Sequence, residues 1–410
     1  MWHSFTRISP IVVGCAVACL GAQPVFAQQS GRPPVGFARP PFHMHTHKTV
    51  APSGLTPQQI RHFYGIDQLP QSMQGRGQVI AIVDAYDNPD AESNLREFDR
   101  AFGLPPCTTA NGCFSKIHSG GKAQRLGADP GWALESSLDI EWAHAIAPHA
   151  KIVLVEAASN SFSDLMSAVS QAIAPRPHGA GANIVSMSWG GTEFFSETQY
   201  DGQFISANGV SFVAASGDFG ATIEYPAASP YVLAVGGTSV STDASGTYLG
   251  ETAWSGSGGG QSAYESAPTY QSNYPIPSDS IGARGVPDVA YSADPTSGFA
   301  VYDAYGYQGQ RGWFVVGGTS AGAPQWSGLL AIANSARVLN GKSTLNAVSA
   351  INGQLYRIAS ASYATTYRDI ISGTNGSCGV LCTAAAGYDY VTGLGSPVAT
   401  RLVGALIDAP

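Results

Sequence analysis

The feature that most constrains the fold of this chain is an alternation of short β-branched runs with longer segments of helical spacing. The runs that predict strands are Val79–Val83, Lys151–Glu156, Ile184–Met187, Val210–Ala214 and Val232–Val235. Segments with helical spacing lie at Asn94–Phe102, Gly131–Ala147 and Phe162–Ala174. This order predicts an α/β fold, with a parallel sheet, right-handed crossovers and helices on both faces. Sites in such sheets form where strand ends meet loops.

The length of the chain is compatible with one large domain or two ordinary ones. The predicted number of domains therefore rests on whether repeats or linkers divide the sequence. No internal repeat or linker divides residues 55–410, and the 44% of hydrophobic residues is enough for a large core. The stretch from Gly246 to Tyr274 is rich in Gly, Ser and Tyr and predicts hairpins and loops on that core. We therefore expect a single domain over residues 55–410.

The first 27 residues have the pattern of a signal peptide. Arg7 precedes an apolar run from Ile11 to Ala22, and Val25 and Ala27 supply the small residues of a cleavage site. The prediction is cleavage after Ala27 and a protein that is secreted or periplasmic, with no membrane span afterwards. An alternative is lipidation of Cys15 or Cys19, each of which follows only a short apolar run.

Residues 28–54 are rich in Pro and Gly and have no hydrophobic period, so we expect a flexible N-terminal tail. His43, His45 and His47 alternate within it. Alternating histidines can bind a transition metal, but a solvated tail that happens to contain them is the simpler interpretation.

Removal of the signal peptide leaves Cys107, Cys113, Cys378 and Cys382. An even number of cysteines in an exported chain favours disulfides. Three pairings are possible, and the spacings favour two local loops, Cys107 with Cys113 and Cys378 with Cys382. A zinc site is the alternative.

The charge of the chain argues against nucleic acid as a partner. The formal net charge is −8, and Lys and Arg form no cluster that would track a phosphate backbone.

A candidate nucleophile lies in the sequence Gly317-Gly318-Thr319-Ser320-Ala321-Gly322, ahead of helical spacing from Trp326 to Val338. A serine at a Gly-rich turn that opens a helix has an exposed hydroxyl beside unpaired backbone N–H groups. The alternative is a simple helix cap. The same four residues recur at Gly236–Ser239 without a helical pattern after them.

None of the nine histidines lies in a setting typical of a catalytic base, but one helix carries suitable carboxylates. Glu135 and Asp139 are four residues apart and project from one face, whereas Glu141 points away. Two desolvated carboxyl groups tend to share a proton in acid, which permits acid and base work. The alternative is a solvated acidic face. Asp218 follows a predicted strand, where it either caps a turn or, if protonated beside Ser320, stabilises an oxyanion.

Together these residues resemble the sedolisin family, serine-carboxyl peptidases with a subtilisin-like fold. The resemblance runs from about Leu55 to Pro397. Its motifs are the Glu135 and Asp139 helix, Ser186-Met187-Ser188-Trp189-Gly190-Gly191, Ser216-Gly217-Asp218, Tyr225-Pro226-Ala227, Gly318-Thr319-Ser320 and Asp369-Ile370.

The resemblance implies a role for each matching position. Ser320 is the expected nucleophile, Glu135 the general base and then acid, Asp139 its orienting partner and Asp218 the oxyanion donor. Asp84 resembles the acidic member of the subtilisin triad, although it is not the main catalytic acid in this family. Ser188, Trp189 and Gly190 resemble the strand edge that pairs with substrate backbone.

The resemblance also implies one structural Ca²⁺ near the C-terminus. Its expected ligands are Asp369, the Ile370 carbonyl, the Ala385 carbonyl, Gly387 and Asp389. Family members commonly have Gly where this chain has Ala385, which a backbone ligand tolerates. The alternative is an Asp-rich turn without metal.

Sedolisins usually carry a large N-terminal prodomain, yet only about 27 residues separate the predicted cleavage site from Leu55. We therefore expect no conventional zymogen, and control by the short tail or by acid pH is left open. The expected function is an acid-acting endopeptidase or tripeptidyl peptidase that acts as a monomer on proteins or peptides. The alternatives are an inactive binding protein of the same fold and an ordinary subtilisin with a histidine base.

Overall fold

The structure is a computed structural model that describes Met1 and residues 33–49, 51–119, 126–205, 209–243, 246–277, 282–345 and 351–409. The predicted signal peptide, with Cys15 and Cys19, lies outside the described residues apart from Met1. Gly31–Pro410 forms one compact unit. Among the described residues, no helix has both the length and the apolar character needed to cross a bilayer.

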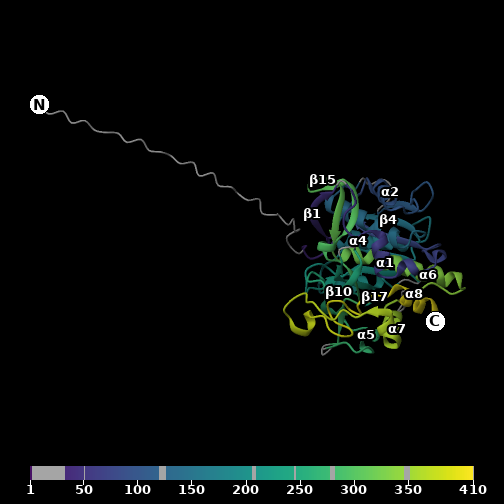
Figure 1. Cartoon of the computed structure of the whole chain (residues 1–410), viewed down its shortest axis with the longest axis vertical. Coiled ribbons are helices and arrows are strands. Elements are labelled where there is room, and N and C mark those ends of the chain that lie inside the picture. Colours follow the sequence, from purple (N-terminus) through teal and green to yellow (C-terminus); the bar gives the residue numbers. More distant parts are fainter. Residues whose placement is uncertain are drawn as a thin grey trace. The chain divides into compact units, whose positions relative to one another are not determined.

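The core of this unit is an eight-stranded sheet with helices on both faces (Figure 1). Its strands, in spatial order, are β10 (Tyr248–Ala253), β9 (Leu233–Thr242), β7 (Ser211–Ala215), β5 (Ile184–Met187), β2 (Val79–Ala85), β4 (Lys151–Ala157) and β3 (Phe114–His118), with β13 (Val289–Ser292) also paired to β9. All these pairings are parallel except that of β10 with β9. The predicted α/β fold and its parallel sheet are confirmed.

The remaining elements cover the sheet or extend from its ends. The helices are α1 (Pro57–Phe63), α2 (Ala91–Phe102), α3 (Pro130–Ile146), α4 (Phe162–Ile173), α5 (Thr269–Ser272), α6 (Gly322–Leu339), α7 (Ile351–Thr366) and α8 (Ala399–Asp408). The other strands are β1 (His43–Thr49), β6 (Gly191–Thr192), β8 (Glu224–Tyr225), β11 (Gly260–Ser266), β12 (Ala283–Val286), β14 (Phe299–Tyr307), β15 (Gln310–Gly317), β16 (Tyr367–Arg368) and β17 (Ser396–Pro397).

The alternation of side chains along β2 explains why helices pack on both faces. Ile80 lies in one apolar cluster with Leu134 of α3, whereas Ala81 lies in a second cluster with Leu165 of α4. Successive residues of a strand point to opposite faces, so a strand buried on both sides is apolar along most of its length. This explains the nearly continuous apolar runs in the sequence.

The described part of residues 28–54 differs from the flexible tail that the sequence predicts. Its strand β1 pairs antiparallel with β15, with His43 opposite Gly317 and Met44 opposite Val316 (Figure 1). This pairing rests on backbone hydrogen bonds to a strand some 270 positions away, so the Pro-rich composition does not reveal it.

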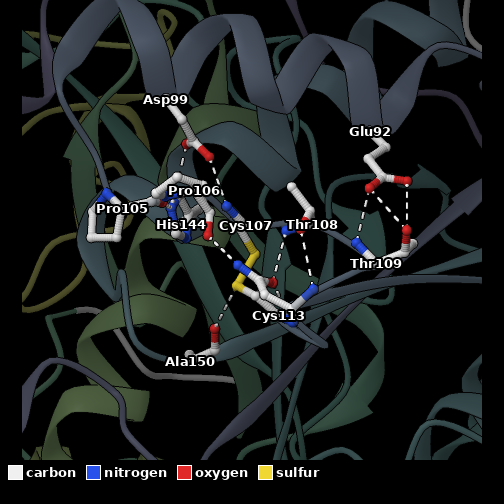
Figure 2. Close-up of a disulfide and its surroundings, with 11 residues drawn as sticks. Glu92, Asp99, Pro105, Pro106, Cys107, Thr108, Thr109, Cys113, His144 and Ala150 are labelled. Atoms are coloured by element: carbon white, nitrogen blue, oxygen red, sulfur yellow. Dashed lines mark hydrogen bonds and ion pairs between the residues drawn. A yellow bond between two sulfur atoms is a disulfide. The ribbon is translucent and has the colours of Figure 1, made fainter.

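Both predicted disulfides are confirmed, Cys107 with Cys113 and Cys378 with Cys382. Figure 2 shows the first of them beneath α2, where Asp99 accepts a hydrogen bond of 2.9 Å from the Cys107 N–H. Because disulfide sulfurs are not thiolates, these pairs do not offer the ligands of the alternative zinc site.

Candidate active site

Ser320 lies in a single 3₁₀ turn, Thr319–Ala321, between the end of β15 and the start of α6. The chain enters this turn through Gly318, which has a φ of +123°. A side chain there is also excluded by space, since a Cβ atom would lie 2.5 Å from Asp218 Oδ2. The matching sequence Gly236–Ser239 lies instead inside β9. The same four residues therefore form a helix-opening turn only at Ser320.

The two carboxylates predicted on one helix face lie on α3, whose first turn is capped by Asp129. Glu135 and Asp139 are both completely buried, which excludes the solvated acidic face. Burial raises the pKa of Glu135 well above its usual range, and the charges of Asp139 and Asp84 add to the rise. Glu141 points away, as predicted, and accepts a hydrogen bond of 3.1 Å from the Tyr302 N–H.

A hydroxyl group connects Asp139 to the turn that carries Ser320. Ser188 Oγ lies 2.9 Å from Asp139 Oδ1 and 3.2 Å from the Ser320 carbonyl oxygen, and it donates to one of these acceptors. Burial raises the pKa of Asp139 well above normal, the charge of Asp84 adds to this, and the Ser188 hydrogen bond opposes it. The surroundings of Asp139 therefore favour its protonated form.

Ser320 is completely buried and lies beside Glu135. Hydrogen bonding from Ser320 lowers the pKa of Glu135 and so opposes the effect of burial, although the contact is longer or less aligned than an ordinary hydrogen bond. Contacts of this kind in a free enzyme commonly shorten when substrate binds. The structure thus brings together a hydroxyl group and a carboxyl group that can exchange a proton.

Asp218 is held by Thr319, which was predicted only as part of a motif. The backbone N–H and the hydroxyl of Thr319 each donate a hydrogen bond of 2.8 Å to Asp218 Oδ1. Burial raises the pKa of Asp218 to about 7, and the Thr319 hydrogen bonds and the charge of Arg39 oppose the rise. Asp218 is therefore protonated in acid.

Asp84 completes the buried acidic group. It is buried near the end of β2, and its pKa is raised well above normal by burial and by the charge of Glu156. The charges of Asp84, Asp139 and Asp218 each act on Glu135, so ionising these buried acids together is costly. The group therefore holds protons in acid and can transfer them.

Comparisons with known proteins show which family the chain resembles. A profile described as the Subtilase family matches residues 130–351 of the 410. Kumamolisin of Bacillus sp. (strain MN-32) is 35% identical over 387 residues, covering 88% of this chain and 65% of kumamolisin. The structure of Pseudomonas sedolisin, a serine-carboxyl proteinase complexed with pseudo-iodotyrostatin, matches with a TM-score of 0.70 and 26% identity, covering 86% of this chain and 98% of that chain. The chain belongs to the sedolisin family.

Within the sedolisin family the chain is also similar to tripeptidyl-peptidase 1 of Dictyostelium discoideum. The two are 30% identical over 386 residues, which cover 85% of this chain and 58% of that protein. The chain therefore spans 58% to 65% of the length of these two curated sedolisin relatives.

The predicted substrate-pairing segment, Ser188 to Gly190, lies directly after β5. Trp189 is buried and donates a hydrogen bond of 2.9 Å from its indole N–H to the Val83 carbonyl, which fixes the segment to β2. Gly190 leaves no room for a side chain, because a Cβ atom would lie 2.5 Å from Glu224 Oε2. The backbone N–H and carbonyl of Gly190 both pair with Arg39 from the N-terminal segment.

The predicted calcium ligands lie in two nearby stretches of chain close to the C-terminus, residues 369–370 and 385–389. The Gly387 N–H lies 3.1 Å from both carboxyl oxygens of Asp369, and the Ala385 N–H donates a 3.2 Å hydrogen bond to Asp389 Oδ2. Burial raises the pKa of Asp389 to about 6. Ile370 follows Asp369 and is buried.

Proposed function

We propose that this protein is an acid-acting serine-carboxyl peptidase that hydrolyses peptide bonds with Ser320, Glu135, Asp139 and Asp218. The observation that carries the proposal is the burial of Glu135 and Asp139 beside Ser320, with the pKa of both raised. A buried carboxyl pair that holds a proton replaces the histidine base of ordinary serine peptidases.

In the proposed reaction, Ser320 Oγ attacks the carbonyl carbon of the substrate and its proton moves to Glu135. Asp139 orients Glu135 and is itself held by Ser188. The protonated Asp218 and the Ser320 N–H donate hydrogen bonds to the oxyanion. Glu135 then protonates the leaving amine, and water hydrolyses the acyl-enzyme.

The protonation of Asp218 gives this proposal its pH dependence. Because its pKa is raised to about 7, Asp218 loses its O–H donor as the pH rises toward and past neutrality. Rising pH also removes the shared proton of the carboxyl pair. Hydrolysis should therefore be greatest in acid and decline as the pH approaches 7.

Three further features belong to the proposal. The predicted signal peptide and the two disulfides support a location outside the cytoplasm. The oxygen ligands of Asp369 and Asp389, together with the carbonyls of Ile370, Ala385 and Gly387, suit one Ca²⁺ ion that stabilises the loop. We propose that the active unit is a monomer.

The test is hydrolysis of a denatured protein by the purified chain from about pH 2 to 8. We expect acid activity that is abolished by Ser320→Ala and by Glu135→Ala. Ser239→Ala is the matched control, because it alters the same four-residue sequence inside β9 and should retain activity.

Activity that peaks near pH 8, or that survives Ser320→Ala, would overturn the proposal. Binding of peptides without hydrolysis at any pH would instead favour an inactive binding protein. Sizing the products distinguishes endopeptidase from tripeptidyl action.

A further inference from the structure

A cluster of side chains that can bind a metal lies at the carboxyl ends of β2, β4 and β3, which are neighbours in the sheet. Its members are Asp87 in the loop after β2, Glu156 in β4 and His118 at the end of β3; they are termed here the His118 cluster. Each residue offers one ligand atom, and these atoms all lie within 4.8 Å of one another. They converge at the edge of the sheet where α/β folds bind their ligands.

Glu156 is the buried member of the His118 cluster, with 1% of its surface exposed. Its Oε1 atom accepts a hydrogen bond of 2.8 Å from the Asn88 N–H. Its Oε2 atom lies only 2.7 Å from His118 Nδ1, yet neither of these two buried atoms makes a hydrogen bond. Because the ring plane of an imidazole fixes the direction of its N–H, the two atoms are not aligned as donor and acceptor. They meet at an angle, as two ligands of one ion do.

The chemistry of the His118 cluster favours zinc over calcium. The cluster combines an imidazole nitrogen with carboxylate oxygens from Asp87 and Glu156, whereas Ca²⁺ takes oxygen ligands. A zinc site with three protein ligands leaves its fourth position to water. The side chains of His118 and Asp87 are 32% and 26% exposed, so an ion can reach the site from solvent.

The ammonium group of Lys116 shows that a cation is favoured at this point. Its Nζ atom lies 2.5 Å from Asp87 Oδ1 and 3.4 Å from Glu156 Oε1, and it donates a hydrogen bond of 2.9 Å to the Asn88 carbonyl. The side chain is 25% exposed and has a flexible four-carbon stem, so the ammonium group can turn out into solvent. A metal ion therefore competes with Lys116, and this competition limits its affinity.

Asn88 holds the loop that carries Asp87. Its Nδ2 atom lies 2.9 Å from the Ala133 carbonyl and 2.9 Å and 3.1 Å from the hydroxyl groups of Ser136 and Ser137, all on α3. Its backbone N–H is the donor that fixes Glu156. The loop is thus held in place without a ligand, and a site formed in advance loses less entropy when it binds one.

We propose that Asp87, His118 and Glu156 form a zinc site in which the ion takes the place of the Lys116 ammonium group. The inference does not depend on peptide hydrolysis, and none of these residues belongs to the proposed calcium site. The bound ion connects β3 and β4 to the loop after β2 and so stabilises the folded chain. Glu156 is also the register partner of Asp84, which places the ion next to the buried acidic group.

The test measures Zn²⁺ binding by isothermal titration calorimetry at about pH 7.5, because imidazole binds metal only in its neutral form. It uses the full chain carrying Ser320→Ala, which excludes self-digestion, with excess Ca²⁺ to occupy the C-terminal site. We expect His118→Ala and Asp87→Asn each to weaken Zn²⁺ binding at least about tenfold, a loss no smaller than that of an outer-shell partner. Lys116→Met removes the competing cation and should strengthen binding about tenfold.

His62→Ala is the matched control. His62 Nδ1 also lies 2.8 Å from a carboxyl oxygen, that of Asp67, but the described residues add no third ligand to that exposed pair. Zn²⁺ should raise the melting temperature of the parent and His62→Ala chains, and it should raise that of His118→Ala less. Circular dichroism checks that every variant is folded.

Zn²⁺ affinities that are equal in the parent, His118→Ala, Asp87→Asn and Lys116→Met chains would overturn the inference. Zn²⁺ binding that appears only in Lys116→Met would also overturn it, because Lys116 would then be the permanent counter-ion of the cluster.

Discussion

Asp218 is held at one carboxyl oxygen by both donors of Thr319, and its other oxygen lies 3.4 Å from His43 Nε2. At acid pH the carboxyl group carries a proton and is a hydrogen-bond donor, because burial raises its pKa to about 7. The role we propose for this residue therefore depends on its ability to donate and not on negative charge.

Two substitutions at Asp218 test whether the residue acts as a hydrogen-bond donor. Asp218→Asn keeps a donor of similar shape, whereas Asp218→Ala removes the donor. We expect Asp218→Ala to lower kcat/KM at about pH 4 by roughly 10²- to 10³-fold, the usual cost of one oxyanion donor, and Asp218→Asn to retain at least about tenfold more activity than the alanine variant. Equal losses in the two variants, both folded by circular dichroism, would contradict the donor role.

The sequence predicts the candidate catalytic residues better than it predicts the residues that hold them in place. Ser320 and Glu135 lie in local patterns, a Gly-rich turn before a helix and a pair of acids four residues apart. The partners that fix them, Ser188 for Asp139 and Thr319 for Asp218, act across 49 and 101 positions of the chain. Contacts over such distances leave no local signal, and only the family motifs pointed to those segments.

At the scale of elements, a second acidic cluster surrounds the 3₁₀ segment Glu197–Gln203 and β11. Its members are Glu193, Glu197, Asp201 and Glu265. Burial and the charge of Glu193 raise the pKa of Glu197 to about 9, and burial and the charge of Asp201 raise that of Glu265 to about 8. A raised pKa means that the folded state favours the protonated form.

This cluster should make the fold more stable in acid. Its contribution is complete below the unfolded pKa of about 4.3 and is lost as the pH rises through the folded values near 8 and 9. We expect the free energy of unfolding, from urea titrations, to fall between about pH 4 and 8. Glu197→Gln should reduce this dependence, because a glutamine does not ionise. If the free energy of unfolding of Glu197→Gln depends on pH as steeply as that of the parent chain, the cluster is not the cause of this dependence.

The elements that sequence analysis found are those buried on both sides. β2, β4, β5 and α3 are apolar or helical along most of their length, and the predicted segments differ from the observed ends by only a few residues. The strand β1 was missed, because its alternating histidines do not distinguish an edge strand from a solvated tail. The strand β10 was expected only as part of a hairpin region, yet it extends the main sheet through its pairing with β9.

At the scale of the whole molecule, the C-terminal loop should couple metal binding to stability. If Asp369 and Asp389 hold Ca²⁺, exhaustive chelation should lower the melting temperature, and added Ca²⁺ should restore it. Asp369→Asn should weaken the response to Ca²⁺ without changing any residue of the catalytic group. A melting temperature that is the same before and after chelation would exclude a structural ion.

The whole account depends on Glu135 as the group that moves the proton of Ser320. The most direct measurement is kcat/KM at about pH 4 for Glu135→Gln and for Glu141→Gln, which makes the same change on the same buried helix but faces β14. Both variants should be compared with the parent chain. We predict a loss of about 10²- to 10⁴-fold for Glu135→Gln and nearly full activity for Glu141→Gln. Near-parental activity in Glu135→Gln would contradict the account.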